Sequence, residues 1–152
     1  GILPVCEDET GIAVVMGHEV AHALADHGAQ RMSAQTLQQI GMVAGNVALQ
    51  KEEDRMLFNQ AYGVGSSVGV MLPFSRSHES EADRIGLKIM AIAGYDPAEA
   101  PELWKRMKAQ SNGGTPEILS THPSNDRRIA ELTKCVPEAR AEARKFGVTS
   151  FQ

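Results

Sequence analysis

The 152-residue sequence has no long apolar run, no concentrated basic segment and no internal repeat. Crossing a bilayer takes an apolar run of roughly 18 to 20 residues, and glycines, serines and a proline interrupt the longest weakly polar stretch, residues 61–74. The net charge is -4 and the basic residues are scattered, which argues against nucleic acid as the main partner because phosphate binding needs a concentrated basic face. The hydrophobic content of 42% is ordinary for a folded domain with one sizeable core.

Cysteine is also scarce, and the start of the chain carries no secretory signal. Cys6 and Cys135 lack the spacing of a metal-binding pair, so they predict either a disulfide in an oxidising compartment or two free, buried thiols. Residues 1–5 resemble the end of an extended segment, so we expect further residues upstream. A signal peptide or a membrane anchor would lie there. Nothing in the sequence indicates the oligomeric state.

Helical periodicity dominates over strand signals, which predicts a single, mainly α domain over residues 1–152, truncated at its N-terminus. We expect Gly28 to stop the first helix, the glycine-rich stretch before Pro73 to separate two helices, and Pro137 to start the last one. The expected helices cover residues 8 or 10 to 27, 29 to about 49, 51–61, 75 or 77 to 93, 97 to about 110, 124 or 125 to 132, and 137 onward.

The first expected helix contains an H-E-x-x-H motif, formed by His18, Glu19 and His22. Positions four apart lie on one face of a helix, so both imidazoles can reach a single Zn²⁺ ion. Glu19 projects beside them, where it can act as the general base of a metalloprotease. The rest of this helix is apolar, and such polar groups are costly to bury unless something pairs them. We therefore interpret the motif as a zinc site and not as two ordinary helix histidines.

A catalytic zinc needs three protein ligands and one open position for water. A histidine six residues after His22 would complete the metzincin pattern, but Gly28 stands there, and Ala25 replaces the glycine of that pattern. His27 lies on a different face of the helix. We interpret His27 as a capping residue or as a hydrogen-bond partner of a zinc ligand.

A glutamate on a separate helix is the better candidate for the third ligand. Glu79 is followed four residues later by Asp83, which places both on one face. Glu79 would bind the metal, and Asp83 would accept the second N–H of a ligand histidine. Glu81 points elsewhere and lacks such a partner, although an acidic, solvated helix start remains the alternative. His78 faces away from Glu79 and is expected at the surface.

A third polar cluster covers residues 120–129. It predicts either a loop that leads into a capped helix or a segment that brings His122 or Arg128 to the zinc site. In the second case, a cation or an N–H donor would stabilise the oxyanion that forms when a peptide carbonyl is attacked.

These motifs together resemble one family of zinc metallopeptidases, which includes the CAAX prenyl protease, the HtpX heat-shock protease, the mitochondrial OMA-type protease and periplasmic proteins of the BepA type. The resemblance implies a minimal zincin-like, mainly helical fold in which Glu79 is the third ligand and Asp83 supports the site. It also implies that His122 can approach the zinc and mask the resting site, and that Arg128 borders it. The matching stretches are residues 16–22, 75–76, 79–83 with Gly86, and 121–123 with 128–129.

Within this family, the sequence of residues 63–76 resembles the periplasmic or lipoprotein branch, and the lack of transmembrane segments is typical of that branch too. The resemblance therefore implies a zinc endopeptidase of the gluzincin type that cleaves proteins or peptides during quality control in the bacterial periplasm or cell envelope. One alternative is a chaperone or binding module with a masked or structural zinc, and another is a helical interaction protein without metal. Zincins present an edge strand before the active helix, and here that strand is either truncated or reduced to residues 2–5.

Overall fold

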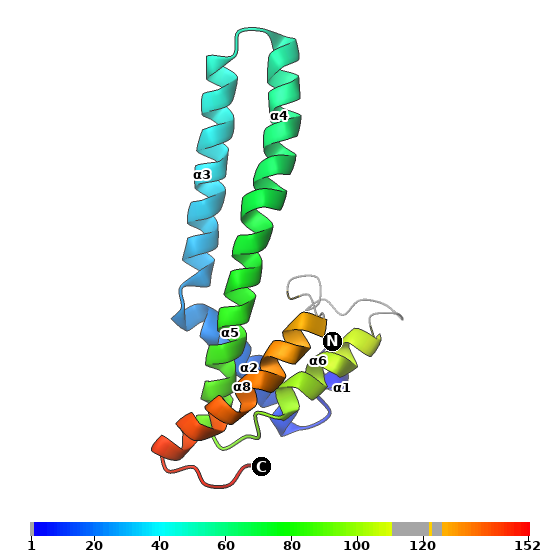
Figure 1. Cartoon of the computed structure of the whole chain (residues 1–152), viewed down its shortest axis with the longest axis vertical. Coiled ribbons are helices and arrows are strands. Elements are labelled where there is room, and N and C mark those ends of the chain that lie inside the picture. The colour runs from blue at the N-terminus through cyan, green and yellow to red at the C-terminus, as the bar shows by residue number, and fades with distance from the viewer. Residues whose placement is uncertain (1, 111–121, 123–125) are drawn as a thin grey trace. The chain divides into compact units, whose positions relative to one another are not determined.

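The computed structural model describes residues 2–110, 122 and 126–152, and all the regular structure in these ranges is helical (Figure 1). This confirms the predicted mainly α fold. The elements are α1 (Leu3–Cys6), α2 (Glu9–Leu24), α3 (His27–Ala48), α4 (Glu52–Ser66), the π-helical turn η1 (Ser67–Met71), α5 (Leu72–Ile92), α6 (Glu99–Gln110) and α8 (Asp126–Lys145).

The described chain forms two compact units, one made of Gly1–Ala25 with Glu79–Gln152 and the other of Asp26–His78. The single-domain organisation stays a prediction. Among the described residues, no helix combines the length and the apolar character that crossing a membrane requires. The expected helix start at residue 124 or 125 lies outside the described residues.

The segment at residues 2–5 is not a strand, because Leu3–Cys6 forms the short helix α1. Pro4 stands in the first turn of α1, where its missing N–H costs no hydrogen bond. The side chains of Val5 and Cys6 are buried in the core of the first unit, and the Val5 carbonyl accepts a hydrogen bond from Arg106 Nε at 3.0 Å. Cys6 and Cys135 are both free thiols.

Helix α2 starts as expected but ends earlier. Asp8 caps it by accepting a hydrogen bond from the Gly11 N–H at 3.0 Å. The helix stops at Leu24, and Asp26 takes a left-handed conformation with a φ of 58° before α3 begins. The expectation that Gly28 ends this helix was wrong, because the turn at Asp26 already breaks it and Gly28 lies inside α3.

Two other expected breaks are also absent. The glycine-rich stretch before Pro73 is helical throughout, because η1 adds a wide turn that places Pro73 in the first turn of α5, where proline is tolerated. Likewise, Pro137 does not start a new helix but lies inside α8. Pro137 is exposed, and so is Thr133, whose carbonyl the proline leaves without its usual helical hydrogen bond.

The core of the first unit is apolar and draws on α1, α2, α5, α6 and α8. Asp96 positions α6 by accepting a hydrogen bond from the Ala98 N–H at 3.0 Å and binding Arg140 of α8. This agrees with the expected cap before a helix that ends at Gln110. The larger buried core residues are Val5, Val14, Leu87, Met90, Leu103, Trp104, Met107, Leu132 and Val136.

Within this unit, α2 and α5 touch through two glycines. A Cβ atom added to Gly17 would stand 2.8 Å from the Gly86 carbonyl oxygen, and one added to Gly86 would stand 2.9 Å from the His18 backbone nitrogen. Only glycine permits this backbone contact. Since Gly17 precedes His18, the contact brings the H-E-x-x-H helix directly against the part of α5 that starts at Glu79.

We expect Gly17→Ala to destabilise the protein by about 1–3 kcal/mol, because the new methyl group must push two backbones apart. Urea unfolding followed by circular dichroism measures this loss. Gly28→Ala is the matched control, since a Cβ added at this helical glycine meets nothing within 4 Å. Equal stability of the two variants would show that the close approach of α2 and α5 is unimportant.

Candidate metal centre

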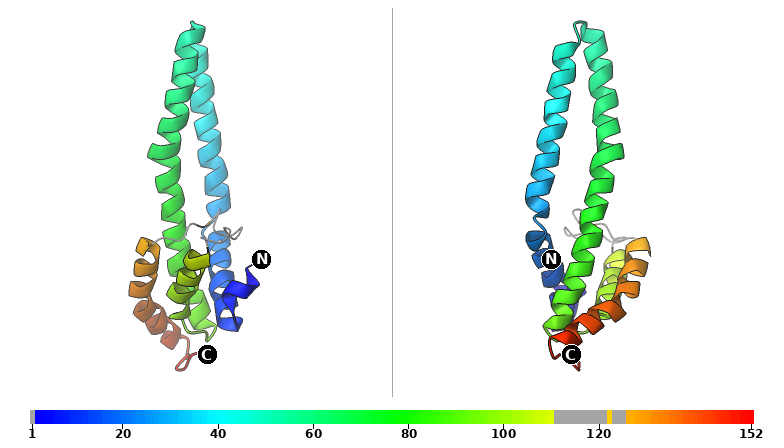
Figure 2. Two further views of the ribbon diagram at one scale, coloured as in Figure 1. Left: turned by 90° about the vertical axis from the view of Figure 1, so that its right-hand side faces the viewer. Right: turned by 60° about the vertical axis from the view of Figure 1, so that its left-hand side comes forward.

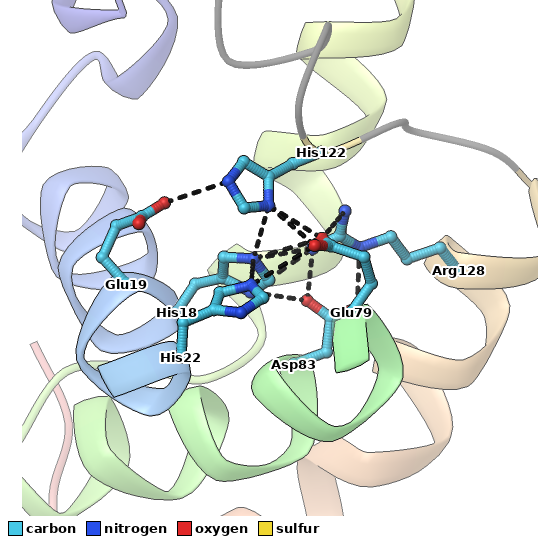
Figure 3. A network of polar contacts seen from close by, with 7 residues as sticks. All are labelled: His18, Glu19, His22, Glu79, Asp83, His122 and Arg128. Carbon is cyan, nitrogen blue, oxygen red and sulfur yellow. Dashed lines mark hydrogen bonds and ion pairs between the residues drawn. The ribbon is translucent and has the colours of Figure 1, made fainter. Parts of the chain in front are cut away.

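Three side chains from α2 and α5 converge in the first unit (Figure 3). The Nε2 atoms of His18 and His22 lie 3.1 Å apart. The two Glu79 carboxylate oxygens stand 3.3 Å from these nitrogens, Oε2 from His18 and Oε1 from His22. Because His18 and His22 are one helical turn apart, their rings meet edge to face, with centroids 4.7 Å apart.

His122 adds a fourth donor to this group. Its Nδ1 atom lies 2.9 Å from both oxygens of Glu79 and 3.2 Å from His18 Nε2. One ligand atom from each of the four residues lies within 4.8 Å of the others. Four donors at 2.0–2.1 Å from a tetrahedral zinc would be roughly 3.3 Å apart. The donor types and their separations therefore fit a zinc ion held by three imidazoles and one carboxylate.

Asp83 orients one of the imidazoles. Its Oδ1 atom lies 3.1 Å from His18 Nδ1, within hydrogen-bond distance. A hydrogen bond there leaves His18 Nε2 directed at the other donor atoms, which is how a carboxylate supports a metal-binding histidine. Glu81 is exposed and does not belong to this group.

Arg128 of α8 is buried beneath the same carboxylates. Its Nε and Nη2 atoms donate to Asp83 at 2.6 and 2.7 Å, and its Nη1 lies 3.1 Å from Glu79 Oε2. Nη2 is also 3.3 Å from the His18 ring nitrogens. The guanidinium group is thus engaged by two carboxylates of the centre, as expected of a residue that supports the site, and its role as an oxyanion donor stays a prediction.

These contacts change the proton affinities of the buried groups. Burial opposes charging of His18, but hydrogen bonds to Asp83 and Glu79 outweigh it and raise the pKa of His18. Burial raises the pKa of Glu79, but the three histidines and Arg128 more than reverse this, so the pKa lies far below its ordinary value. Burial, His18 and Arg128 act on Asp83 in the same way, and its pKa is also lowered. Both carboxylates are therefore ionised at neutral pH.

Glu19 contacts the edge of the His122 ring that faces away from Glu79 (Figure 3). Its Oε1 atom lies 3.5 Å from His122 Nε2, and about half of its side chain is exposed to solvent. Glu19 thus stands beside the converging donors and can still exchange protons with water.

Trp104 of α6 is a site residue that sequence reasoning missed. The Arg128 guanidinium carbon lies 3.6 Å from the centroid of its ring, and the His18 ring meets it edge-on at 6.0 Å. This cation–π contact holds the guanidinium flat in the orientation that serves Asp83 and Glu79. The only available signal was that the chain contains a single tryptophan, which equally suggests an ordinary core residue.

We expect Trp104→Leu to weaken zinc binding by about tenfold, because misplaced groups behind metal ligands typically cost 10- to 100-fold in affinity. Trp104→Phe should retain most of the affinity, since phenylalanine keeps an aromatic face under Arg128. Competition with a chromophoric zinc chelator measures both. If Trp104→Phe and Trp104→Leu lost the same zinc affinity, the contact between the aromatic ring and Arg128 would not contribute to zinc binding.

Two histidines expected near the surface or near the ligands belong to the second unit instead. His27 and His78 are buried and their rings stack, with centroids 4.1 Å apart. The expectation of a surface His78 was wrong, because His27 and Phe74 cover its ring and Gln30 Oε1 lies 3.1 Å from its Nε2. His27 starts α3 and packs on His78, a contact that local spacing does not reveal.

Comparison with known proteins agrees with the resemblance seen in the motifs. Residues 1–136 match the model of Peptidase family M48. The chain is 37% identical over 146 residues to the mitochondrial metalloendopeptidase OMA1 of Schizosaccharomyces pombe, covering 93% of this chain and 41% of that protein. The corresponding Saccharomyces cerevisiae protein is 38% identical over 145 residues, with 91% and 40% covered. No solved structure matches the chain.

A bacterial relative, the beta-barrel assembly-enhancing protease of Escherichia coli, is 31% identical over 134 residues, which cover 82% of this chain and 27% of that protein. The chain thus spans about two fifths of the length of the fungal relatives. Their mitochondrial names do not support the expected periplasmic location, which rested on residues 63–76 and on the lack of transmembrane segments. Since the family model matches most of the sequence, the chain belongs to peptidase family M48.

Proposed function

We propose that this chain is the catalytic part of a zinc-dependent endopeptidase of the gluzincin type that hydrolyses peptide bonds in protein substrates. The observation that carries the proposal is the convergence of His18, His22 and Glu79 on one point, with Glu19 beside it. The named relatives are metalloendopeptidases or proteases, which supports the same reaction class.

His18, His22 and Glu79 would hold the ion. When bound, Zn²⁺ supplies the Lewis acidity that activates water and polarises the scissile carbonyl. Glu19, the partly exposed carboxylate next to the ligands, would accept the proton of the attacking water and pass it to the leaving amine. A general base must come within hydrogen-bond reach of the proton that it takes, and the position of Glu19 beside His122 is consistent with this demand.

The buried residues behind the ligands would keep their geometry. Asp83 would fix the ring orientation of His18, and Arg128 would hold Asp83 and Glu79 in their ionised states. Two buried carboxylates next to each other repel, and the guanidinium group between them compensates for that repulsion. The guanidinium group thus offsets one of the two negative charges before any ion or substrate arrives.

His122 supports a second candidate function, a chaperone-like or binding module in which the zinc is masked. Its Nδ1 atom already lies with the three other donors. As a fourth ligand it would fill the coordination position that water needs in a catalytic site. In the endopeptidase that we favour, His122 would have to leave this position before substrate binds.

We expect His122→Ala to raise the rate of casein cleavage severalfold if His122 masks the centre, because the variant leaves a coordination position open. Zinc affinity should fall at the same time, since one donor is lost. Zinc titration and a fluorescent casein assay measure the two effects on one preparation. A variant that loses activity but keeps its zinc affinity would instead place His122 with the groups that act on substrate.

Location and physiological substrate rest on the relatives alone. Their names place some in mitochondria and associate another with β-barrel assembly. We propose substrates among envelope or organelle proteins, a class consistent with both names.

Purified chain tests the central proposal directly. The endopeptidase is expected to contain one zinc per chain by elemental analysis and to cleave casein. A chelator should stop the cleavage, and added zinc should restore it. A chain that purifies without zinc and does not bind it would rule out the metal, while a zinc-loaded chain without activity would favour the masked module.

A further inference from the structure

Helices α3 and α4 form a long hairpin in the second unit (Figures 1 and 2). No residue of α4 is buried, and in α3 only His27 is. The two helices meet through glycines instead: a Cβ added to Gly41 would come within 2.1 Å of the Tyr62 hydroxyl, and one added to Gly45 within 2.1 Å of the Phe58 ring. Close contact between small residues and rings therefore joins the two arms.

Polar side chains bridge the two arms of the hairpin. The Gln38 side-chain amide donates to the Ser66 hydroxyl at 2.6 Å, and the Asn46 amide donates to Asn59 Oδ1 at 2.6 Å. The Tyr62 hydroxyl donates to the Gln38 carbonyl at 3.2 Å. Some of the hydrogen-bonding groups of the arms thus face each other.

Large apolar side chains, in contrast, point outward. In water a hairpin gains stability by burying such side chains, so an aqueous environment does not favour leaving so many of them exposed. The outward residues are Met32, Leu37, Ile40, Val43 and Val47 on α3, Met56, Leu57 and Val64 on α4, and Val68 and Val70 on η1.

Away from the tip and the base of the hairpin, the arms also carry no charge on any side. Residues 32–50 and 56–75 contain no Asp, Glu, Lys, Arg or His, although 22% of the whole chain is charged. The charges between the arms are gathered at the tip, in residues 51–55. A protein partner would cover one side of the hairpin and leave the others in water, where charged side chains are tolerated. A nonpolar medium disfavours charge around the whole circumference.

We propose that the arms of the α3–α4 hairpin insert into one leaflet of a lipid bilayer, with their outward apolar side chains against the acyl chains. Small residues at the helix contact, hydrogen bonds between the helices and apolar residues outside are the arrangement of helices that pack within a membrane. The exposed amides of Gln35, Gln39 and Gln60 hold the arms at the level of the headgroups. Because the arms are uncharged, the surface they fit is a zwitterionic lipid.

Flotation of the full chain with vesicles of pure phosphatidylcholine tests the proposal. The chain should float with the vesicles, and the bound fraction should not change when the salt concentration rises about tenfold, since no charge pairing is involved. Val43→Asp should lower the partition coefficient by about tenfold, because it brings a charge into the nonpolar layer. Phe146→Asp is the matched control: Phe146 is as exposed as Val43 (65% and 62%) but lies outside the hairpin.

Circular dichroism of both variants checks that they are folded, so that unfolding can be separated from a loss of vesicle binding. The proposal is overturned if the wild-type chain stays at the bottom of the gradient, or if Val43→Asp floats as well as Phe146→Asp. The wild-type chain could instead fail to float and form a dimer. If Val43→Asp dissociated that dimer, a second copy of the chain, and not lipid, would cover the hairpin. Zinc content and casein cleavage are separate readouts, so the two proposals can fail independently.

Discussion

Glu19→Gln is expected to abolish peptide cleavage while leaving zinc binding and folding unchanged. Glutamine keeps the shape of the side chain but cannot accept the proton of the attacking water. Because Glu19 stands beside the converging donors and is about half exposed, its replacement removes no ligand and leaves no buried group unpaired. Loss of a general base costs roughly 10²- to 10⁴-fold in rate, so kcat for casein or a quenched peptide should fall by at least about 100-fold.

Glu9→Gln is the matched control for this experiment. Glu9 is an exposed glutamate on the same helix, in its first turn and away from the donors. Zinc content measured on all three proteins separates a catalytic loss from a metal loss. If Glu19→Gln cleaved casein at the wild-type rate, the general base would have to be another residue, and His122 would be the first to consider because it lies next to Glu19.

Glu79→Gln is expected to weaken zinc binding by more than about 100-fold and to remove activity with it. A neutral amide replaces the one anionic donor among the four, and even residues behind metal ligands affect affinity by 10- to 100-fold. Glu79 also compensates for Arg128, whose Nη1 lies 3.1 Å away in a buried setting. The variant leaves Asp83 as the remaining carboxylate beside that guanidinium group.

Chelator competition measures this affinity, and Glu81→Gln provides the control. Glu81 lies two residues along the same helix but is exposed and outside the group of donors. Its replacement should leave zinc affinity within about twofold of wild type, since surface substitutions away from a site have small effects. Equal losses in the two variants would contradict Glu79 as the ligand, and a larger loss in Glu81→Gln would exchange their roles.

Much of the candidate site follows from local periodicity. The spacing of His18 and His22 places both on one face of an apolar helix, and the same spacing pairs Glu79 with Asp83. These inferences need no tertiary information, because a helix determines which residues share a face. The structure brings all four together, at distances of 3.1–3.3 Å between the facing atoms.

Other features depend on contacts that local patterns do not contain. His78 looks like a surface residue from its position next to Glu79, yet His27 and Phe74 cover it. Pro73 and Pro137 look like helix starts or stops, yet Pro73 follows a π-helical turn, Pro137 lies on the exposed side of α8, and both helices continue. Trp104 reads as one more core residue until Arg128 is seen stacked on its ring.

The sequence by itself determined the mainly helical class, the family and the set of polar residues that share helix faces, because helical periodicity and motif spacing are properties of short segments. Only the tertiary structure decided how distant segments meet: the glycine contact between α2 and α5, the packing of Arg128 between Trp104 and two carboxylates, and the hydrogen bonds across the α3–α4 hairpin. These contacts join residues that are 20 or more positions apart in all but one case, and such pairings depend on which surfaces pack together rather than on the residues beside each position.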